Sequence, residues 1–63
     1  MVLYSVTNHR SVAEFPDFGD ALTLYRNQRI RKAAPVLCTD DPQGFTGEQN
    51  EAIDAANRET RAP

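Results

Sequence analysis

The chain has 63 residues, a net charge of -2, one cysteine and one histidine. A chain of this length forms one domain at most, residues 1–63, and buries only about 60% of the surface that its unfolded form exposes. One cysteine excludes an internal disulfide, and one cysteine with one histidine cannot supply the usual ligands of a structural zinc site. Because small domains without these supports often gain stability from a second copy, the composition favours a homodimer.

The N-terminal residues MVLYSV are apolar only over a short run, which Ser5 interrupts. Such a stretch is too short for a secretory signal or a membrane span. A single thiol without a targeting segment is typical of a reducing compartment, so we expect a cytoplasmic protein that does not enter a membrane.

Residues 2–15 predict a β-hairpin. The segments VLYSVT and SVAEF are rich in strand-forming residues and flank the turn-like pair Asn8–His9. With this pair as the turn, Tyr4 faces Ala13. A slip by one residue would bring Glu14 onto the core face, so burial favours the first register. The residues that then share the core face are Val2, Tyr4, Val6, Ala13 and Phe15.

A helix is predicted from about residue 18 to residue 34, with Asp17 or Asp20 as its N-terminal cap. Pro35 stops it, because a proline biases the preceding residue, Ala34, away from helical geometry. At about 100° per residue, the face that meets the core carries Phe18, Ala21, Leu22 and Tyr25.

The segment VLCT, residues 36–39, predicts a short third strand that buries one of its two faces, either Val36 and Cys38 or Leu37 and Thr39. Free cysteine is among the residue types most often buried, so we expect Cys38 to be buried.

Thr46 and Gln49 have the spacing of a capping box and predict a second helix from about residue 47 to residue 60. Its acidic residues come first and its basic residues last, an order that suits the helix dipole. Ile53 is its only large apolar residue, so we expect it to pack lightly or to be completed by a partner. The predicted architecture is α+β, with element order ββαβα and helices on one face of a small sheet.

Four of the seven basic residues lie in the run RNQRIRK, residues 26–32. Cations near a helix C-terminus complement the helix dipole and contribute about 0.3–1 kcal/mol each, which is the simplest interpretation of the run. The alternatives are an acidic protein partner or nucleic acid. Residues 1–39 carry five basic and three acidic residues, whereas residues 40–63 carry two basic and six acidic ones. The acidic second helix could therefore face the basic run within one chain or across a dimer.

Leu24 and Ile30 lie off the predicted core face, with Asn27 between them. Their exposure could be incidental, or the second helix could bury them in part. The other interpretation is a contact strip for a partner or for a second copy, for which an open sheet edge is the alternative. The candidate partner-binding residues are Leu24, Arg26, Asn27, Arg29, Ile30, Arg31 and Lys32.

No pattern of residues predicts catalysis. Cys38 would need a base to act as a nucleophile, and His9 is predicted at the distant hairpin turn. Asp40–Asp41–Pro42 is typical of a turn rather than of a metal site. Gly44 and Gly47 lack the pattern of a phosphate-binding loop. We therefore expect no enzymatic activity, no cofactor and no metal.

The sequence favours a small non-enzymatic intracellular module that acts by occupying a surface of a larger protein. Very short, acidic proteins without motifs are frequent among phage and mobile-element products that inhibit host machinery, including anti-CRISPR-type inhibitors. That comparison concerns size and character only, and not sequence. The alternatives are a nucleic-acid-binding accessory protein that uses the basic helix end, and a structural subunit of a larger assembly.

Overall fold

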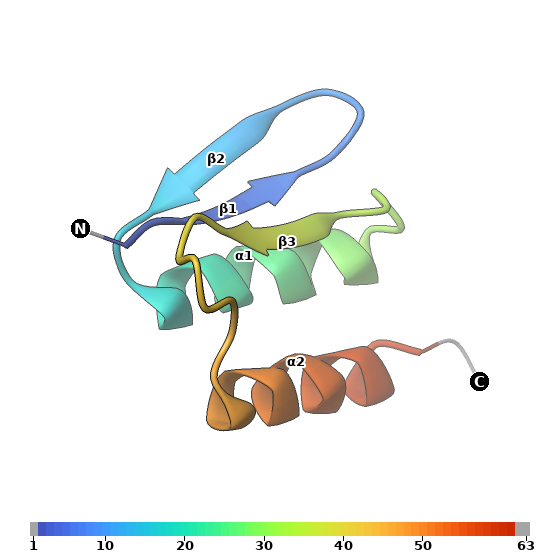
Figure 1. Ribbon diagram of the computed structural model, residues 1–63. Coiled ribbons are helices and arrows are strands. Elements are labelled where there is room, and N and C mark those ends of the chain that lie inside the picture. The colour runs from blue at the N-terminus through green and yellow to red at the C-terminus, as the bar shows by residue number, and fades with distance from the viewer. Residues whose placement is uncertain (1, 62–63) are drawn as a thin grey trace.

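The computed structural model describes residues 2–61 and has the predicted α+β architecture (Figure 1). Its elements follow one another in the order ββαβα. They are β1 (Tyr4–Thr7), β2 (Val12–Phe15), α1 (Phe18–Ile30), β3 (Val36–Thr39) and α2 (Gly47–Glu59). No helix within residues 2–61 has the length and apolar character needed to cross a membrane.

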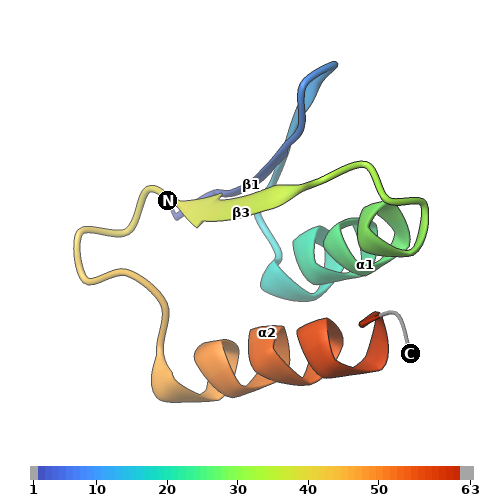
Figure 2. The ribbon, with the colours of Figure 1, turned by 90° about the vertical axis from the view of Figure 1, so that its right-hand side faces the viewer.

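The three strands form one antiparallel sheet with β1 in the centre, in the order β2-β1-β3. Both helices lie on the same side of this sheet, with α1 beneath the strands and α2 packed against α1 (Figures 1 and 2). Within residues 2–61, no element covers the opposite face of the sheet. We call this side the open face; strand alternation places on it Ser5, Thr7, Val12, Glu14, Val36 and Cys38.

The hairpin register differs by two residues from the predicted one, because Tyr4 pairs with Phe15 instead of Ala13. A shift of two leaves every side chain on its predicted face, so burial cannot distinguish the two registers. The turn decides. The side-chain oxygen of Asn8 accepts hydrogen bonds from the backbone N–H groups of Arg10 (2.8 Å) and Ser11 (3.0 Å). Asn8 thus closes the loop, and His9 and Arg10 form its tip.

The centre of the core consists of Val6, Ala21 and Tyr25, and Ala56 of α2 is also buried. Val6, Ala21 and Tyr25 were each predicted on a face that meets the core, and α2 was expected to pack only lightly. The partly buried side chains that pack against the centre are Tyr4, Phe15, Leu22, Leu24, Leu37 and Ile53. The other predicted core residues, Val2, Ala13 and Phe18, are half-buried.

The prediction that Cys38 is buried is wrong, because its side chain is exposed on the open face. In the register between β1 and β3, Leu37 is the partner of Val6, so Leu37 shares the buried face of Val6. Successive residues of a strand point to opposite sides, so Cys38 points away from the helices. Of the two faces that the sequence left open, the one with Leu37 and Thr39 is therefore the inner one.

Three aromatic rings join the start of both helices to the sheet. The ring of Tyr4 lies 5.4 Å from that of Phe18 and 6.3 Å from that of Phe45, between centroids. Phe45 comes from the loop that precedes α2, and its ring also lies 6.0 Å from Phe18. Edge-to-face and offset pairs at these distances add about 0.5–1.5 kcal/mol to the burial of the rings. The cluster fixes where α2 begins.

The predicted N-terminal caps are present in both helices. The carboxylate of Asp17 accepts a hydrogen bond from the backbone N–H of Asp20 (3.1 Å). At the start of α2, the hydroxyl of Thr46 accepts from the N–H of Gln49, and the side chain of Gln49 accepts in return from the N–H of Thr46. The capping box predicted for α2 is thus confirmed.

Helix α1 ends at Ile30, four residues before the predicted end. The backbone N–H of Lys32 donates to the carbonyl of Arg29 and that of Ala33 to the carbonyl of Gln28. This pair of bonds, together with a φ of 60° at Lys32, is a Schellman-type helix end. The helix therefore stops at its own cap, before the restriction that Pro35 places on Ala34 (φ 53°) applies.

Candidate binding surface

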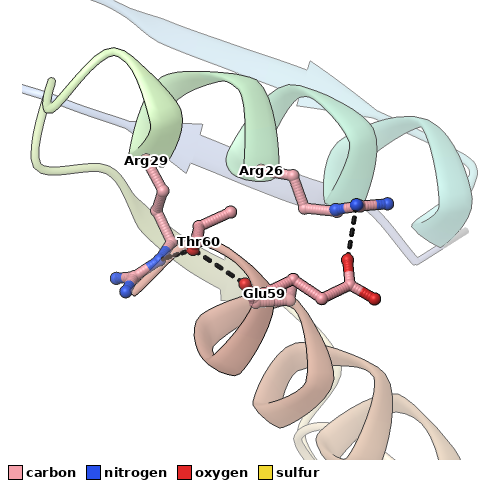
Figure 3. A network of polar contacts seen from close by, with 5 residues as sticks. Arg26, Arg29, Glu59 and Thr60 are labelled. Atoms are coloured by element: carbon pink, nitrogen blue, oxygen red, sulfur yellow. Dashed lines mark hydrogen bonds and ion pairs between the residues drawn. The ribbon is translucent and has the colours of Figure 1, made fainter. Parts of the chain in front are cut away.

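Two of the predicted contact residues bind the protein's own second helix. The guanidinium of Arg26 forms an ion pair with the carboxylate of Glu59 (Figure 3). The Nε of Arg29 donates to the hydroxyl of Thr60 (2.7 Å), which in turn donates to the carbonyl of Ala56 (2.7 Å). The structure thus shows α1 and α2 facing each other within one chain, one of the two arrangements that the charge distribution allowed.

The rest of this helix–helix contact is also largely polar. The hydroxyl of Tyr25 donates to the side-chain oxygen of Asn57 (2.8 Å), and the guanidinium of Arg29 lies 5.8 Å from the ring centroid of Tyr25. Ala56 is the buried apolar residue that α2 contributes. The expectation that α2 packs lightly fits this small apolar contribution.

Leu24 does not form an exposed strip with Ile30, because it packs against the core. Helix α1 is buried on two sides instead of one. Its sheet side is marked by Gln28, whose side chain accepts a hydrogen bond from Asn8 of the hairpin (3.0 Å). Leu24 lies one turn before Gln28 on that side, whereas Ile30 points away from both layers and is 63% exposed.

The two helices run in parallel, so both end at the same end of the molecule (Figures 1 and 2). Phe18 and Gln49, near the starts of the two helices, both contact Tyr4. The hydrogen bond between Asn8 and Gln28 joins the hairpin turn to the last turn of α1, and the bond between Arg29 and Thr60 joins the ends of the helices. The turn and both helix ends therefore lie together.

This arrangement gathers positive charge. Six of the seven basic residues lie in the hairpin turn or at the two helix ends, and the seventh, Arg26, lies one turn earlier. We call this region the basic end; its cations are Arg10, Arg29, Arg31, Lys32, Arg58 and Arg61. Sequence reasoning found three of them and missed Arg10, Arg58 and Arg61, because they come from other segments. The order of acidic before basic residues in α2 indicated that its C-terminal end is positively charged. That this end lies beside the end of α1 follows only from the parallel course of the two helices.

Eight of the nine acidic side chains lie at the opposite end or between the two ends. Asp40 is fixed there, since its carboxylate accepts from the backbone N–H of Leu3 (2.8 Å). The other acidic residues near the helix starts are Asp17, Asp20, Asp41 and Glu48. Among the described residues, Glu59 is the one carboxylate at the basic end, and it pairs with Arg26. A protein of net charge -2 is thus strongly polarised.

Among residues 2–61, three large apolar side chains are exposed, and all three lie at the basic end. Val12 is 65% exposed and Val36 is 56% exposed. Both pair with Thr7, so they flank it in one row across the open face. The third is Ile30, the last residue of α1. A shallow depression just after the end of α1 is lined by Arg29, Lys32, Ala34 and Pro35.

The residues considered for catalysis lie apart. His9 lies in the hairpin turn, whereas Cys38 lies towards the opposite end of β3, beside Ser5. The carboxylate of Asp41 accepts from the backbone N–H of Gln43 (2.9 Å), which confirms the predicted turn. Within residues 2–61, no three potential metal ligands lie close enough together to hold an ion.

Comparison of the chain with models of known protein families, with curated proteins and with solved structures found no match in any of the three.

Proposed function

We propose that the protein is a small non-enzymatic binding module that acts by occupying a surface of a larger protein. One observation carries the proposal: the three large apolar side chains that are exposed in the described part of the chain lie at the same end as six of the seven basic residues. Protein interfaces combine apolar contact with arginine and depend on a few central residues for their affinity.

The proposed contact surface extends beyond the predicted one. Of the predicted residues, Ile30, Arg31, Lys32 and Asn27 are exposed. Arg26 remains 47% exposed beside its ion pair and can still reach a partner. Leu24 is half-buried and contributes less. Val12, Val36 and Arg10 join the surface from the sheet.

An inhibitor of host machinery encoded by a phage or a mobile element is one form of this function, and a cytoplasmic location suits it. This form is supported by the size and the acidic composition of the chain. Blocking a surface needs only a folded contact face, which a domain of this size can present.

We also propose that the protein forms a homodimer through a sheet edge. The outer strands β2 and β3 each present a row of backbone N–H and C=O groups that can pair with another strand. Of the two dimer contacts that the sequence left open, the Leu24/Ile30 strip is disfavoured, because Leu24 packs inward against the core. Light scattering at high micromolar concentration should give twice the mass of one chain, and a monomer would contradict the proposal.

The binding function is tested by affinity capture from nuclease-treated extract of the native cells. The variant Ile30→Gln with Val36→Thr removes exposed apolar surface without changing charge. We expect this variant to capture about one tenth or less of the partner protein that the original chain captures. Thr23→Gln, at an exposed position of α1 outside this end, is the matched control and should bind normally. Equal capture by both variants would refute the proposal.

Nucleic-acid binding is the second candidate, and the gathering of cations at the basic end favours it. Binding to duplex DNA would weaken steeply with salt, with a log–log slope of about -0.9 for each phosphate neutralised. All five aromatic residues lie within the described chain, and each is buried or half-buried, so stacking on bases receives no support. Recovery of nucleic acid alone, lost at moderate salt, would favour this candidate.

A further inference from the structure

We infer that the basic end binds an acidic segment of a partner polypeptide. This inference rests on the proposed protein-binding function and names the chemistry of the partner. The residues that carry it come from three elements: Arg10 from the hairpin turn, Arg31 and Lys32 from the end of α1, and Arg58 and Arg61 from the end of α2.

The simplest alternative is that these cations only complement the helix dipoles, and the charge count decides against it. Each helix C-terminus has a partial charge of about -0.5, so two of them amount to about -1. Arg58 lines a depression with Glu48, Glu51 and Asp54, so its charge is set against theirs and is left out of the sum. The other five cations of the basic end add +5, and the ion pair between Arg26 and Glu59 adds nothing. The sum is about +4, more than the dipoles require.

The excess charge lies on exposed side chains. Arg10, Arg31, Lys32, Arg58 and Arg61 are all exposed, and Arg29 is half-buried against Thr60 and Tyr25. Exposed charges interact over about 8 Å at physiological salt, so neighbouring cations raise one another's energy. A bound anion would relieve that repulsion. The charged residues at this end are thus placed for a ligand at some cost to the free protein.

The apolar neighbours of the cations, and not the cations themselves, favour a peptide carboxylate over a phosphate as the ligand. Five of its six cations are arginines, whose planar guanidinium groups bind carboxylates through two parallel hydrogen bonds. Phosphate is bound by the same geometry, so the apolar neighbours decide. Arg29 and Lys32 share a depression with Ala34 and Pro35, and the exposed Ile30 lies between Arg29 and Arg31 in the chain, so this end suits a segment that alternates acidic and apolar residues.

The test is a titration of the isotope-labelled full chain with a synthetic glutamate-rich peptide that contains leucine. NMR measures the amide chemical shifts of the chain during the titration. We expect shifts at Arg10, Arg31, Lys32 and Arg58, and none around Asp17 and Asp40. A lysine-rich peptide of equal length is the control ligand and should leave the basic end unchanged.

Two variants separate a local effect from one of net charge. Arg31→Gln with Lys32→Gln lowers the net charge by two at the basic end. Gln43→Glu with Asn50→Glu lowers it by two at exposed positions elsewhere. We expect the first to weaken peptide binding about tenfold and the second to change it less than about twofold. Equal effects of the two variants would overturn the inference.

A short DNA duplex of mixed sequence provides the competing ligand. If the duplex shifts the same amides and the glutamate-rich peptide does not, the inference is wrong and nucleic acid is the ligand. If neither ligand binds, the inference is also wrong. If the peptide does not bind but capture of a protein still depends on Ile30, the inference of an acidic partner is wrong and the proposed protein-binding function is supported. If the peptide binds but capture does not depend on Ile30, the proposed function is wrong and the inference that the basic end recognises acidic segments is supported.

Discussion

The two sides of α1 are held in different ways. On the sheet side, apolar side chains meet and Val6 and Ala21 are almost completely buried. On the α2 side, the contacts are mostly polar, with the hydroxyl of Tyr25 on Asn57 and the guanidinium of Arg29 on Thr60. A buried large apolar side chain contributes about 1.5–3 kcal/mol, whereas a hydrogen bond adds about 0.5–1.5 kcal/mol net. The sheet side therefore provides most of the stability, and the α2 side positions the second helix.

The largest effect should come from the sheet side. Val6→Ala should lower the free energy of unfolding by about 2–3 kcal/mol, because Val6 is 1% exposed and its removal leaves a cavity. In a domain of this size, that loss populates the unfolded state. Denaturant unfolding followed by circular dichroism measures it. Val12→Ala, on the open face, is the control and should cost less than about 0.5 kcal/mol.

A smaller and more local effect should come from the α2 side. Tyr25→Phe keeps the ring and removes the hydroxyl that Asn57 accepts from. We expect a loss of about 0.5–1 kcal/mol. Hydrogen exchange should show it as faster exchange in Gly47–Glu59 and little change in Tyr4–Thr7. Equal acceleration of exchange in both segments would show that the two sides of α1 unfold as one unit. That result would contradict a separate, weaker contact between α1 and α2.

A change at the end of α1, outside both contact sides, should stabilise the protein. Lys32 has a φ of 60°, a backbone conformation that glycine adopts without the steric cost of a Cβ. Lys32→Gly should therefore raise the free energy of unfolding by about 0.5–1 kcal/mol. Arg31→Gly is the matched control: its φ is -81°, so the same substitution there should destabilise the protein. Thermal unfolding of the two variants shows whether the two substitutions change the stability in opposite directions.

The smallest effect is expected at the ion pair. Arg26 and Glu59 are both about half exposed, so water screens their attraction. Arg26→Gln should change the free energy of unfolding by less than about 0.5 kcal/mol, and added salt should shrink that difference further, because it screens exposed charges. A loss above about 1 kcal/mol, measured by denaturant unfolding, would mean that the α2 side depends on charge more than its geometry indicates.

The sequence by itself determined the order of the elements, where the two helices begin and which strand residues share a face. These features depend on residues only a few positions apart, such as Asp17 with Asp20 and Thr46 with Gln49, or on strict alternation along a strand. Tertiary structure decided the hairpin register, the outward direction of Cys38 and the burial of Leu24, because each depends on which neighbour lies on which side. It also decided the basic end. Arg10, Lys32 and Arg58 are distant in sequence. The parallel course of α1 and α2 brings the ends of the two helices together, and the packing of the hairpin turn on the last turn of α1 adds Arg10.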